Sequence, residues 1–81
     1  MAATYTARRR RIEIGAVSGP TNDFILHADG VPFAFVGAEF GGMWAVSLIR
    51  DGAWDALTPD ELCHGRDNAF AAAKAIHQGV E

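Results

Sequence analysis

The sequence predicts an α+β fold, in which an antiparallel sheet of four to five strands carries one C-terminal helix packed on one face. Three observations support this. Short apolar segments are separated by turn-forming residues, the dipeptide Asp-Gly occurs at two of these turns, and the one long alanine-rich segment comes last. Strands followed by a single helix favour a two-layer domain. The 81 residues suffice for one core, so we expect residues 1–81 to form a single domain.

The first strand is expected to begin at Arg8. From there Arg10, Ile12 and Ile14 alternate with Arg9, Arg11 and Glu13, which is the period-2 pattern of a half-buried strand. Residues 1–7 have no strong pattern and are expected to be frayed or weakly paired. Residues 18–23, Ser-Gly-Pro-Thr-Asn-Asp, are dense in turn formers and predict the end of this strand.

Residues 24–28 and 33–40 predict the second and third strands. Asp29-Gly30 lies between them, and Asp-Gly readily adopts the positive φ angles that a type I′ hairpin turn requires. Pro32 lacks a backbone donor, so the third strand is expected to begin at Phe33 or to lie at an edge of the sheet. Gly41-Gly42 predicts another tight turn.

Residues 43–50 predict the fourth strand. Trp44, Val46 and Leu48 occupy one face, and the intervening Ala45, Ser47 and Ile49 occupy the other. Both faces are apolar, so each is expected to meet protein. Asp51-Gly52 repeats the hairpin signal and is expected to return the chain through residues 53–57.

The helix signals come last. Thr58-Pro59-Asp60-Glu61 has the form of a capping box and predicts a short helical turn before Gly65. Asp67 is expected to cap the main helix over residues 68–78, and Gly79 to end it. Its apolar stripe consists of Ala69, Phe70, Ala73, Ile76 and Val80.

Charge divides the chain into a basic segment and an acidic body. The segment is the run Arg8 to Arg11; from residue 12 onward there are three Lys or Arg residues and ten Asp or Glu residues, or 3 − 10 = −7. The formal charge of −3 for the whole chain hides this division. Separated charge of this kind attracts oppositely charged partners but identifies no chemistry.

Cysteine content and hydropathy favour a cytoplasmic protein. The arginine run is not followed by the apolar segment of about 7 to 15 residues that a secretory signal needs. The longest uncharged apolar stretch, residues 31–38, falls short of the roughly 20 residues that span a bilayer. The single Cys63 cannot form an internal disulfide and fits a reducing compartment.

No catalytic, metal or cofactor motif is present in the sequence. Cys63, His27, His64 and His77 are the soft-ligand residues, and they lack the paired spacing of a structural zinc site. A thiol nucleophile at Cys63 with His64 or His77 as its base is the enzymatic alternative, but nothing around it predicts an oxyanion hole. The glycines form no phosphate-binding motif. We therefore expect a protein that is not an enzyme and binds no cofactor.

Two surfaces are candidates for binding a partner. Trp54 and the acidic residues Asp51, Asp55, Asp60, Glu61 and Asp67 gather around the last hairpin and the helix entry. These carboxylates could pair with basic residues of another protein, and exposed apolar residues near Trp54 would supply the desolvated anchor. The alternative surface is the run Arg8, Arg9, Arg10 and Arg11, which would contact nucleic-acid phosphates although the acidic body opposes it. Dimerisation through the first strand remains open.

The segment 42–52, Gly-Met-Trp-Ala-Val-Ser-Leu-Ile-Arg-Asp-Gly, followed by residues 67–76, Asp-Asn-Ala-Phe-Ala-Ala-Ala-Lys-Ala-Ile, resembles small proteins of phages and mobile elements. Among these the chain is most similar to the single-domain anti-CRISPR proteins that inhibit type I systems. The resemblance implies a non-enzymatic inhibitor in the bacterial cytoplasm that binds the Cascade surveillance complex and blocks target DNA binding. Such proteins share no motif, so the resemblance assigns no residue. The alternative is a small nucleic-acid-binding regulator or antitoxin-like protein that uses Arg8 to Arg11.

Overall fold

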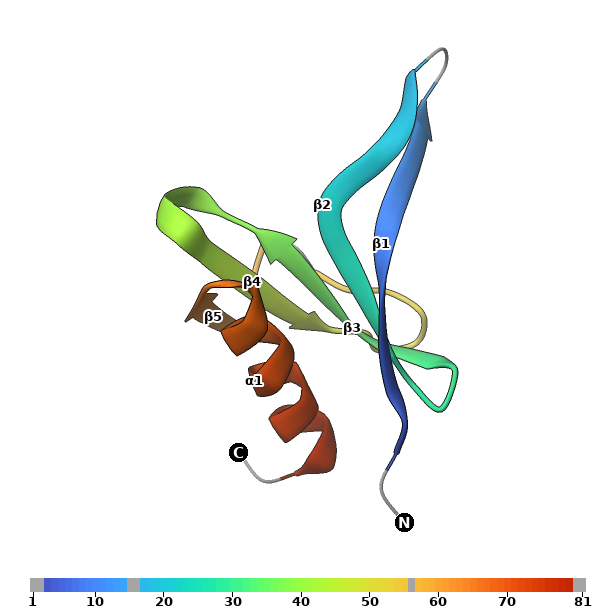
Figure 1. The fold of residues 1–81 in the computed structure, drawn as a ribbon. Helices are drawn as coiled ribbons and strands as arrows, with labels where there is room; N and C mark the ends of the chain where they lie inside the picture. Colours follow the sequence, from blue (N-terminus) through green and yellow to red (C-terminus); the bar gives the residue numbers. More distant parts are fainter. Residues whose placement is uncertain (1–2, 15–16, 56, 80–81) are drawn as a thin grey trace.

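A computed structural model of the chain describes residues 3–14, 17–55 and 57–79. Among these residues, five strands form one antiparallel sheet in chain order. The strands are β1 (Tyr5–Ile14), β2 (Val17–Ala28), β3 (Val31–Ala38), β4 (Met43–Leu48) and β5 (Glu61–His64), with the single turn η1 (Phe40–Gly42) between β3 and β4. The helix α1 (Arg66–Gln78) follows β5 and packs on one face of the sheet (Figure 1). The predicted α+β fold is therefore confirmed.

The main core lies between α1 and the central strands. Leu26, Val36 and Val46 point from β2, β3 and β4 toward the helix and are completely or almost completely buried. They meet Ala69 and Ala73, both 0% exposed, on the facing side of α1. Two alanines one turn apart give the helix a slim surface, which lets its backbone lie close to the sheet. Ala69, Ala73 and Phe70 of the predicted apolar stripe thus pack on the sheet, whereas Val80 lies outside the described residues.

The end of α1 is as predicted, whereas its start is not. Gly79 adopts a left-handed φ of 75°, and its N–H points to the carbonyl oxygens of Ala75 and Ile76, which is the usual helix stop. At the other end the N-cap position is Gly65, with a φ of 82°, and the helix begins at Arg66. Asp67 lies inside the first turn, where its charge favours the helix dipole without capping a backbone N–H.

The described part of the N-terminal segment, residues 3–7, is held by hydrogen bonds and strand pairing, although the sequence predicts a frayed or weakly paired segment over residues 1–7; residues 1–2 lie outside the described residues. β1 begins at Tyr5, opposite Ala28. The N–H of Thr4 donates to Oδ1 of Asp29 at 2.9 Å, and the N–H of Asp29 donates to the carbonyl of Thr4 at 2.8 Å. Tyr5 also packs edge-on against Phe33, with 5.6 Å between ring centroids. Hydrogen bonds to the next hairpin, rather than an internal pattern, order this segment.

The turn predicted at residues 18–23 is wrong, because these residues belong to β2 and pair with β1. The register shifts between Arg9 and Arg11, and at this bulge the hydroxyl of Thr21 donates to the carbonyl of Arg10 at 3.1 Å. β3 pairs with β2 only from Phe24 to Ala28 in the described register, so the rest of β1 and β2 is a two-stranded ribbon projecting beyond the sheet (Figure 1). A ribbon with no sheet on either side tolerates turn-forming residues. Its connection at residues 15–16 lies outside the described residues.

Pro32 is accommodated within a central strand, against the expectation that the strand begins at Phe33 or lies at an edge. β3 begins at Val31, and the register between β2 and β3 shifts between Leu26 and His27. The bulge absorbs the missing donor and places Phe33 in the core beside Ala34. The preceding turn is as predicted, with positive φ angles of 50° at Asp29 and 83° at Gly30.

The segment between β4 and α1 differs most from the prediction. Asp51 and Gly52 make the expected turn, with φ angles of 54° and 78°, but the returning chain forms only an isolated bridge between Arg50 and Ala53. The predicted helical turn at residues 58–61 is absent from the described residues there. Glu61 instead starts β5, which pairs with β4, and the N–H of Asp60 donates to the carbonyl of Val46 at 2.8 Å. Pairing with an available sheet edge outweighs the local capping signal.

Candidate functional site

The loop formed by residues 49–60, here called the acidic loop, covers the face of the sheet opposite α1. Phe35 and Ser47 alternate with the helix-facing residues of β3 and β4, so their side chains lie on this second face. The indole of Trp54 stacks on the ring of Phe35, with centroids 5.0 Å apart and planes 12° apart. The buried hydroxyl of Ser47 donates to the carbonyl of Asp55 at 3.0 Å. A small second core therefore attaches the loop to the sheet.

Arg10 of β1 completes this attachment. Its guanidinium carbon lies 5.2 Å from the centroid of Trp54 and 5.6 Å from that of Phe35, which is within the range of cation–π attraction. One of its nitrogens lies 3.2 Å from Oδ2 of Asp23 on β2. Arg10 thus fastens the loop to the ribbon and is partly enclosed by its own protein. It is the least exposed of the four consecutive arginines.

Asp55 shapes the exposed part of the acidic loop. Its Oδ1 accepts hydrogen bonds from the N–H groups of Leu57 and Thr58, at 2.9 and 3.2 Å. An aspartate that binds backbone N–H groups two and three residues ahead holds a tight turn. Leu57 protrudes from this turn and is 95% exposed. Leu57 is thus an exposed apolar residue three positions after Trp54 in the sequence, while the Trp54 ring itself is half-buried.

Asp60 anchors the other end of the loop. Its carboxylate accepts a hydrogen bond from the N–H of Leu48 at 2.8 Å and lies 3.3 Å from the guanidinium of Arg50. The backbone hydrogen bond from Leu48 is the main reason that the pKa of Asp60 falls below its ordinary value of 3.8, and Arg50 adds to the effect. Partial desolvation opposes it. Asp60 therefore stays ionised to a lower pH than an ordinary aspartate does.

The structure gathers part of the predicted acidic surface and separates two members from it. Asp51, Asp55 and Asp60 belong to the acidic loop, and Glu61 follows directly in β5. Asp67 lies beyond the other end of β5, more than about 10 Å of extended chain away. There its carboxylate is 3.7 Å from Nε of Arg66. The acidic surface on the face opposite α1 is therefore limited to the acidic loop. Glu61 pairs with the helix-facing Val46, so its side chain lies on the α1 side of the sheet, and Asp67 lies beyond β5.

The arginine run is divided between the two faces of the sheet. Arg9 donates to the carbonyl of Thr21 at 3.1 Å, and its guanidinium lies 5.0 Å from the ring centroid of Phe24, a residue of the helix-side core. Arg10 lies on the opposite face, against Trp54. Arg8 and Arg11 are exposed. The run is therefore not one continuous cationic surface.

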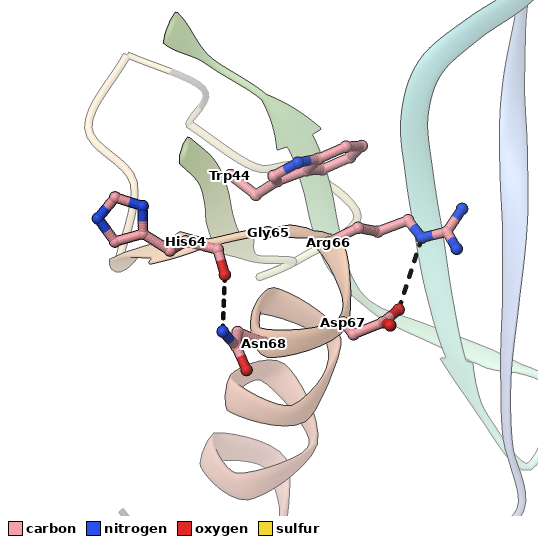
Figure 2. A pocket seen from close by; sticks show the side chains of 6 residues that line it. All are labelled: Trp44, His64, Gly65, Arg66, Asp67 and Asn68. Carbon is pink, nitrogen blue, oxygen red and sulfur yellow. Dashed lines mark hydrogen bonds and ion pairs between the residues drawn. The ribbon is translucent and has the colours of Figure 1, made fainter. Parts of the chain in front are cut away.

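A hollow of about 350 Å³ lies beside the start of α1. Figure 2 shows the indole of Trp44 above the first turn of the helix, with the His64 ring and the Arg66 side chain extending to opposite sides. The side-chain amide of Asn68 donates to the carbonyl of His64 at 2.7 Å. Asp67 already supplies negative charge at this helix start, so the hollow gives no indication of an anionic ligand.

The residues considered for catalysis or metal binding are dispersed. Cys63 packs against the core opposite Trp44, whereas the adjacent His64 belongs to the other face of β5 and is exposed. Nδ1 of His77 lies 2.9 Å from the hydroxyl of Tyr5. In the described part of the chain, no three His, Cys, Asp or Glu side chains are grouped as a metal site would need.

Within the described residues, no helix has the length and apolar character needed to cross a membrane. Comparison of the chain with protein-family models, with curated proteins and with solved structures found no match. The fold and the chemistry of its surfaces are therefore the basis for any functional conclusion.

Proposed function

We propose that this protein is a non-enzymatic, protein-binding inhibitor that docks on a basic surface of its partner through the acidic loop. The observation that carries the proposal is Leu57, a large apolar side chain that is 95% exposed and flanked in sequence by Asp55 and Asp60. An apolar residue surrounded by charges is the usual composition of an interface centre and its rim. Burying one leucine contributes about 1.5–3 kcal/mol to association.

The conformation of the acidic loop supports this proposal. Trp54 stacks on Phe35, Ser47 bonds to the backbone of the loop, and Asp55 fixes the turn that presents Leu57. A surface held in place before binding loses less conformational entropy when a partner docks. These contacts hold the described residues of the loop, 49–55 and 57–60, in which regular pairing is limited to the bridge between Arg50 and Ala53.

The partner expected from the sequence resemblance is the Cascade complex of a type I CRISPR system. Cascade must hold nucleic acid, so it carries basic surfaces, and the carboxylates of Asp51, Asp55 and Asp60 are complementary to such a surface. Occupying it would block target DNA by occlusion, with no chemical step. Charge steers and orients the encounter, while Leu57 supplies the apolar contact.

The test compares alanine substitutions at two exposed aliphatic residues. Leu57→Ala removes the proposed anchor, and Val31→Ala removes another exposed apolar side chain, 64% exposed, at the start of β3. If Leu57 becomes buried, its truncation weakens the complex about tenfold or more, whereas Val31→Ala leaves it unchanged. The measurement is the affinity for purified type I Cascade complexes by biolayer interferometry. Equal affinity of the two variants would contradict the assignment of this surface.

The projecting ribbon favours a second candidate, a nucleic-acid-binding regulator. Beyond Phe24, β1 and β2 form a two-stranded ribbon with the exposed Arg11 at its base, and such a ribbon fits the major groove of DNA. This candidate predicts salt-sensitive binding of duplex DNA by the isolated protein. Replacing Arg8 and Arg11 with alanine would reduce the slope of log affinity against log salt by about 1.8, or roughly 0.9 for each lost phosphate contact. Fluorescence anisotropy with labelled duplexes measures it.

A further inference from the structure

A second hollow, of about 320 Å³, lies on the face of the sheet opposite α1, between β1 and the acidic loop. We call it the arginine groove. Ile25, Ile49 and Trp54 contribute apolar surface, while Arg8, Arg10 and His27 contribute polar groups. We propose that the arginine groove binds a small organic anion, namely a carboxylate or phosphate group carried on an apolar body. This inference is independent of the proposed docking surface, which lies on the exposed side of the loop.

The strand geometry brings the two arginines to one side of the groove. Arg8 pairs with Ile25 across β1 and β2, and both line the groove. Arg10 is two residues further along the same strand, and its guanidinium lies against Trp54 on the same face. Residues two apart on a strand are separated by about 7 Å, so two long arginine side chains can converge on one anionic group. The side-chain alternation along β1 therefore places Arg8 and Arg10 together as the basic wall of the groove.

These arginines retain donors for a ligand. Arg8 takes part in none of the ion pairs described for residues 3–14, 17–55 and 57–79. Arg10 uses one nitrogen on Asp23, and a guanidinium has five N–H donors. Carboxylates and phosphates match the planar fork of arginine donors. The resulting charge-assisted hydrogen bonds are stronger than hydrogen bonds between neutral groups. The basic wall therefore favours an oxyanion.

The apolar surface determines the rest of the ligand. Ile25, Ile49 and the half-buried Trp54 offer area to a hydrocarbon or aromatic body, which an inorganic ion cannot use. A neutral hydrocarbon would in turn leave the arginines solvated and unused. The volume is at the lower end of the range for small-molecule sites. A compact amphipathic anion uses both kinds of surface.

His27 adds an observation that the fold itself does not explain. Its ring lines the groove, and its Nδ1 is buried without a hydrogen-bond partner among the described residues. More than about 90% of buried polar groups in proteins have a partner, so an unpartnered nitrogen calls for one. A ring nitrogen beside the groove is thus left without a partner by the described residues, next to the N–H donors of Arg8 and the remaining N–H donors of Arg10.

The test uses nuclear magnetic resonance titrations of the full chain with four matched probes. Naphthoate and naphthyl phosphate combine an apolar body with an anion, naphthalenemethanol has the body alone, and inorganic phosphate has the charge alone. The indole N–H signals of Trp54 and Trp44 report on the arginine groove and on the hollow at the start of α1, respectively. Naphthoate, naphthyl phosphate or both are expected to shift the Trp54 signal saturably and leave Trp44 unchanged, which also identifies the head group.

Arg8→Gln is the test variant, and Arg11→Gln is its control, because both remove one exposed charge from β1 but only Arg8 lines the groove. Arg8→Gln should weaken binding about fivefold, the effect of one partly exposed charge-assisted contact, and Arg11→Gln should not. The proposal would be overturned if both variants weakened binding equally, or if shifts were confined to the Trp44 signal. It would also be overturned if naphthalenemethanol or inorganic phosphate bound as tightly as the organic anions. Absence of saturable binding by both organic anions would overturn it too. Shifts of the Trp54 signal that depend on protein concentration alone would show instead that the groove binds a second copy of the chain.

Discussion

Replacing Trp54 with alanine tests whether the acidic loop is part of the folded structure. Trp54 is half-buried, and its indole is the ring stacked on the buried Phe35. Truncating a fully buried tryptophan costs about 3–5 kcal/mol, so a half-buried one should cost about 2 kcal/mol, including about 1 kcal/mol for the stacked pair. The expected total stability for a chain of this length is about 4–12 kcal/mol. The substitution should therefore remove a large fraction of it.

The assay is urea denaturation followed by far-ultraviolet circular dichroism, because removing a tryptophan changes the fluorescence signal. A loss of about 2 kcal/mol should also lower the Tm by roughly 8–16 °C in a domain of this size. Leu57→Ala is the control: this exposed side chain should change stability by less than about 0.5 kcal/mol. If Trp54→Ala lowers the free energy of unfolding by no more than Leu57→Ala does, the stacking contact between Trp54 and Phe35 does not hold the loop on the sheet.

Three further predictions concern single contacts. Val46→Ala, at a 0% exposed position between sheet and helix, should cost about 2–3 kcal/mol in urea denaturation, and a loss below about 1 kcal/mol would contradict the described core. Asp55→Asn keeps the oxygen that accepts the N–H groups of Leu57 and Thr58 whereas Asp55→Ala removes it, so amide hydrogen exchange of these two residues should accelerate only in the alanine variant. Asp60→Asn should be less stable than the native protein near pH 7. The folded-state pKa of Asp60 lies below 3.8, so its charge stabilises the fold above that pH. The stability difference between the native protein and Asp60→Asn should disappear as the pH falls through the folded-state pKa. A stability difference that does not change with pH would argue against the charged hydrogen bond.

The parts of the fold predicted correctly are those in which local pattern and burial agree. Trp44, Val46 and Leu48 alternate with Ala45 and Ser47, and both faces of β4 are covered, one by α1 and the other by the acidic loop. Asp29-Gly30 and Gly79 require backbone conformations that few other residues adopt easily, so their sequence signals are strong. Such positions can be identified without knowledge of the tertiary structure.

The incorrect predictions arise where a distant partner decides the conformation. Residues 18–23 contain turn formers, but pairing with β1 and the hydrogen bonds of Thr21 keep them extended. The capping pattern at residues 58–61 is overridden because Asp60 and Glu61 complete the pairing of β4. A single sequence does not reveal which strand edge is open to receive these residues.

The candidate site was predictable in composition but not in arrangement. The acidic residues near Trp54 are evident in the sequence, whereas the contacts that each of them makes depend on the fold. Asp55 and Asp60 hold the loop through backbone N–H groups, and Asp67 pairs with Arg66 beyond the other end of β5. Leu57 stands out only when its exposure is known. The arginine groove likewise is evident only in the fold, where Arg10 of β1 lies against Trp54 of the acidic loop.

Capture of purified type I Cascade complexes by the tagged protein, with target-DNA binding assayed on the same samples, tests the proposed function most directly. The native protein and the Val31→Ala variant should capture a complex and abolish its DNA binding, whereas Leu57→Ala should do both at least about tenfold less effectively. Failure to capture a complex of any type I subtype would contradict the proposed partner. Capture that is insensitive to Leu57→Ala would contradict the proposed surface.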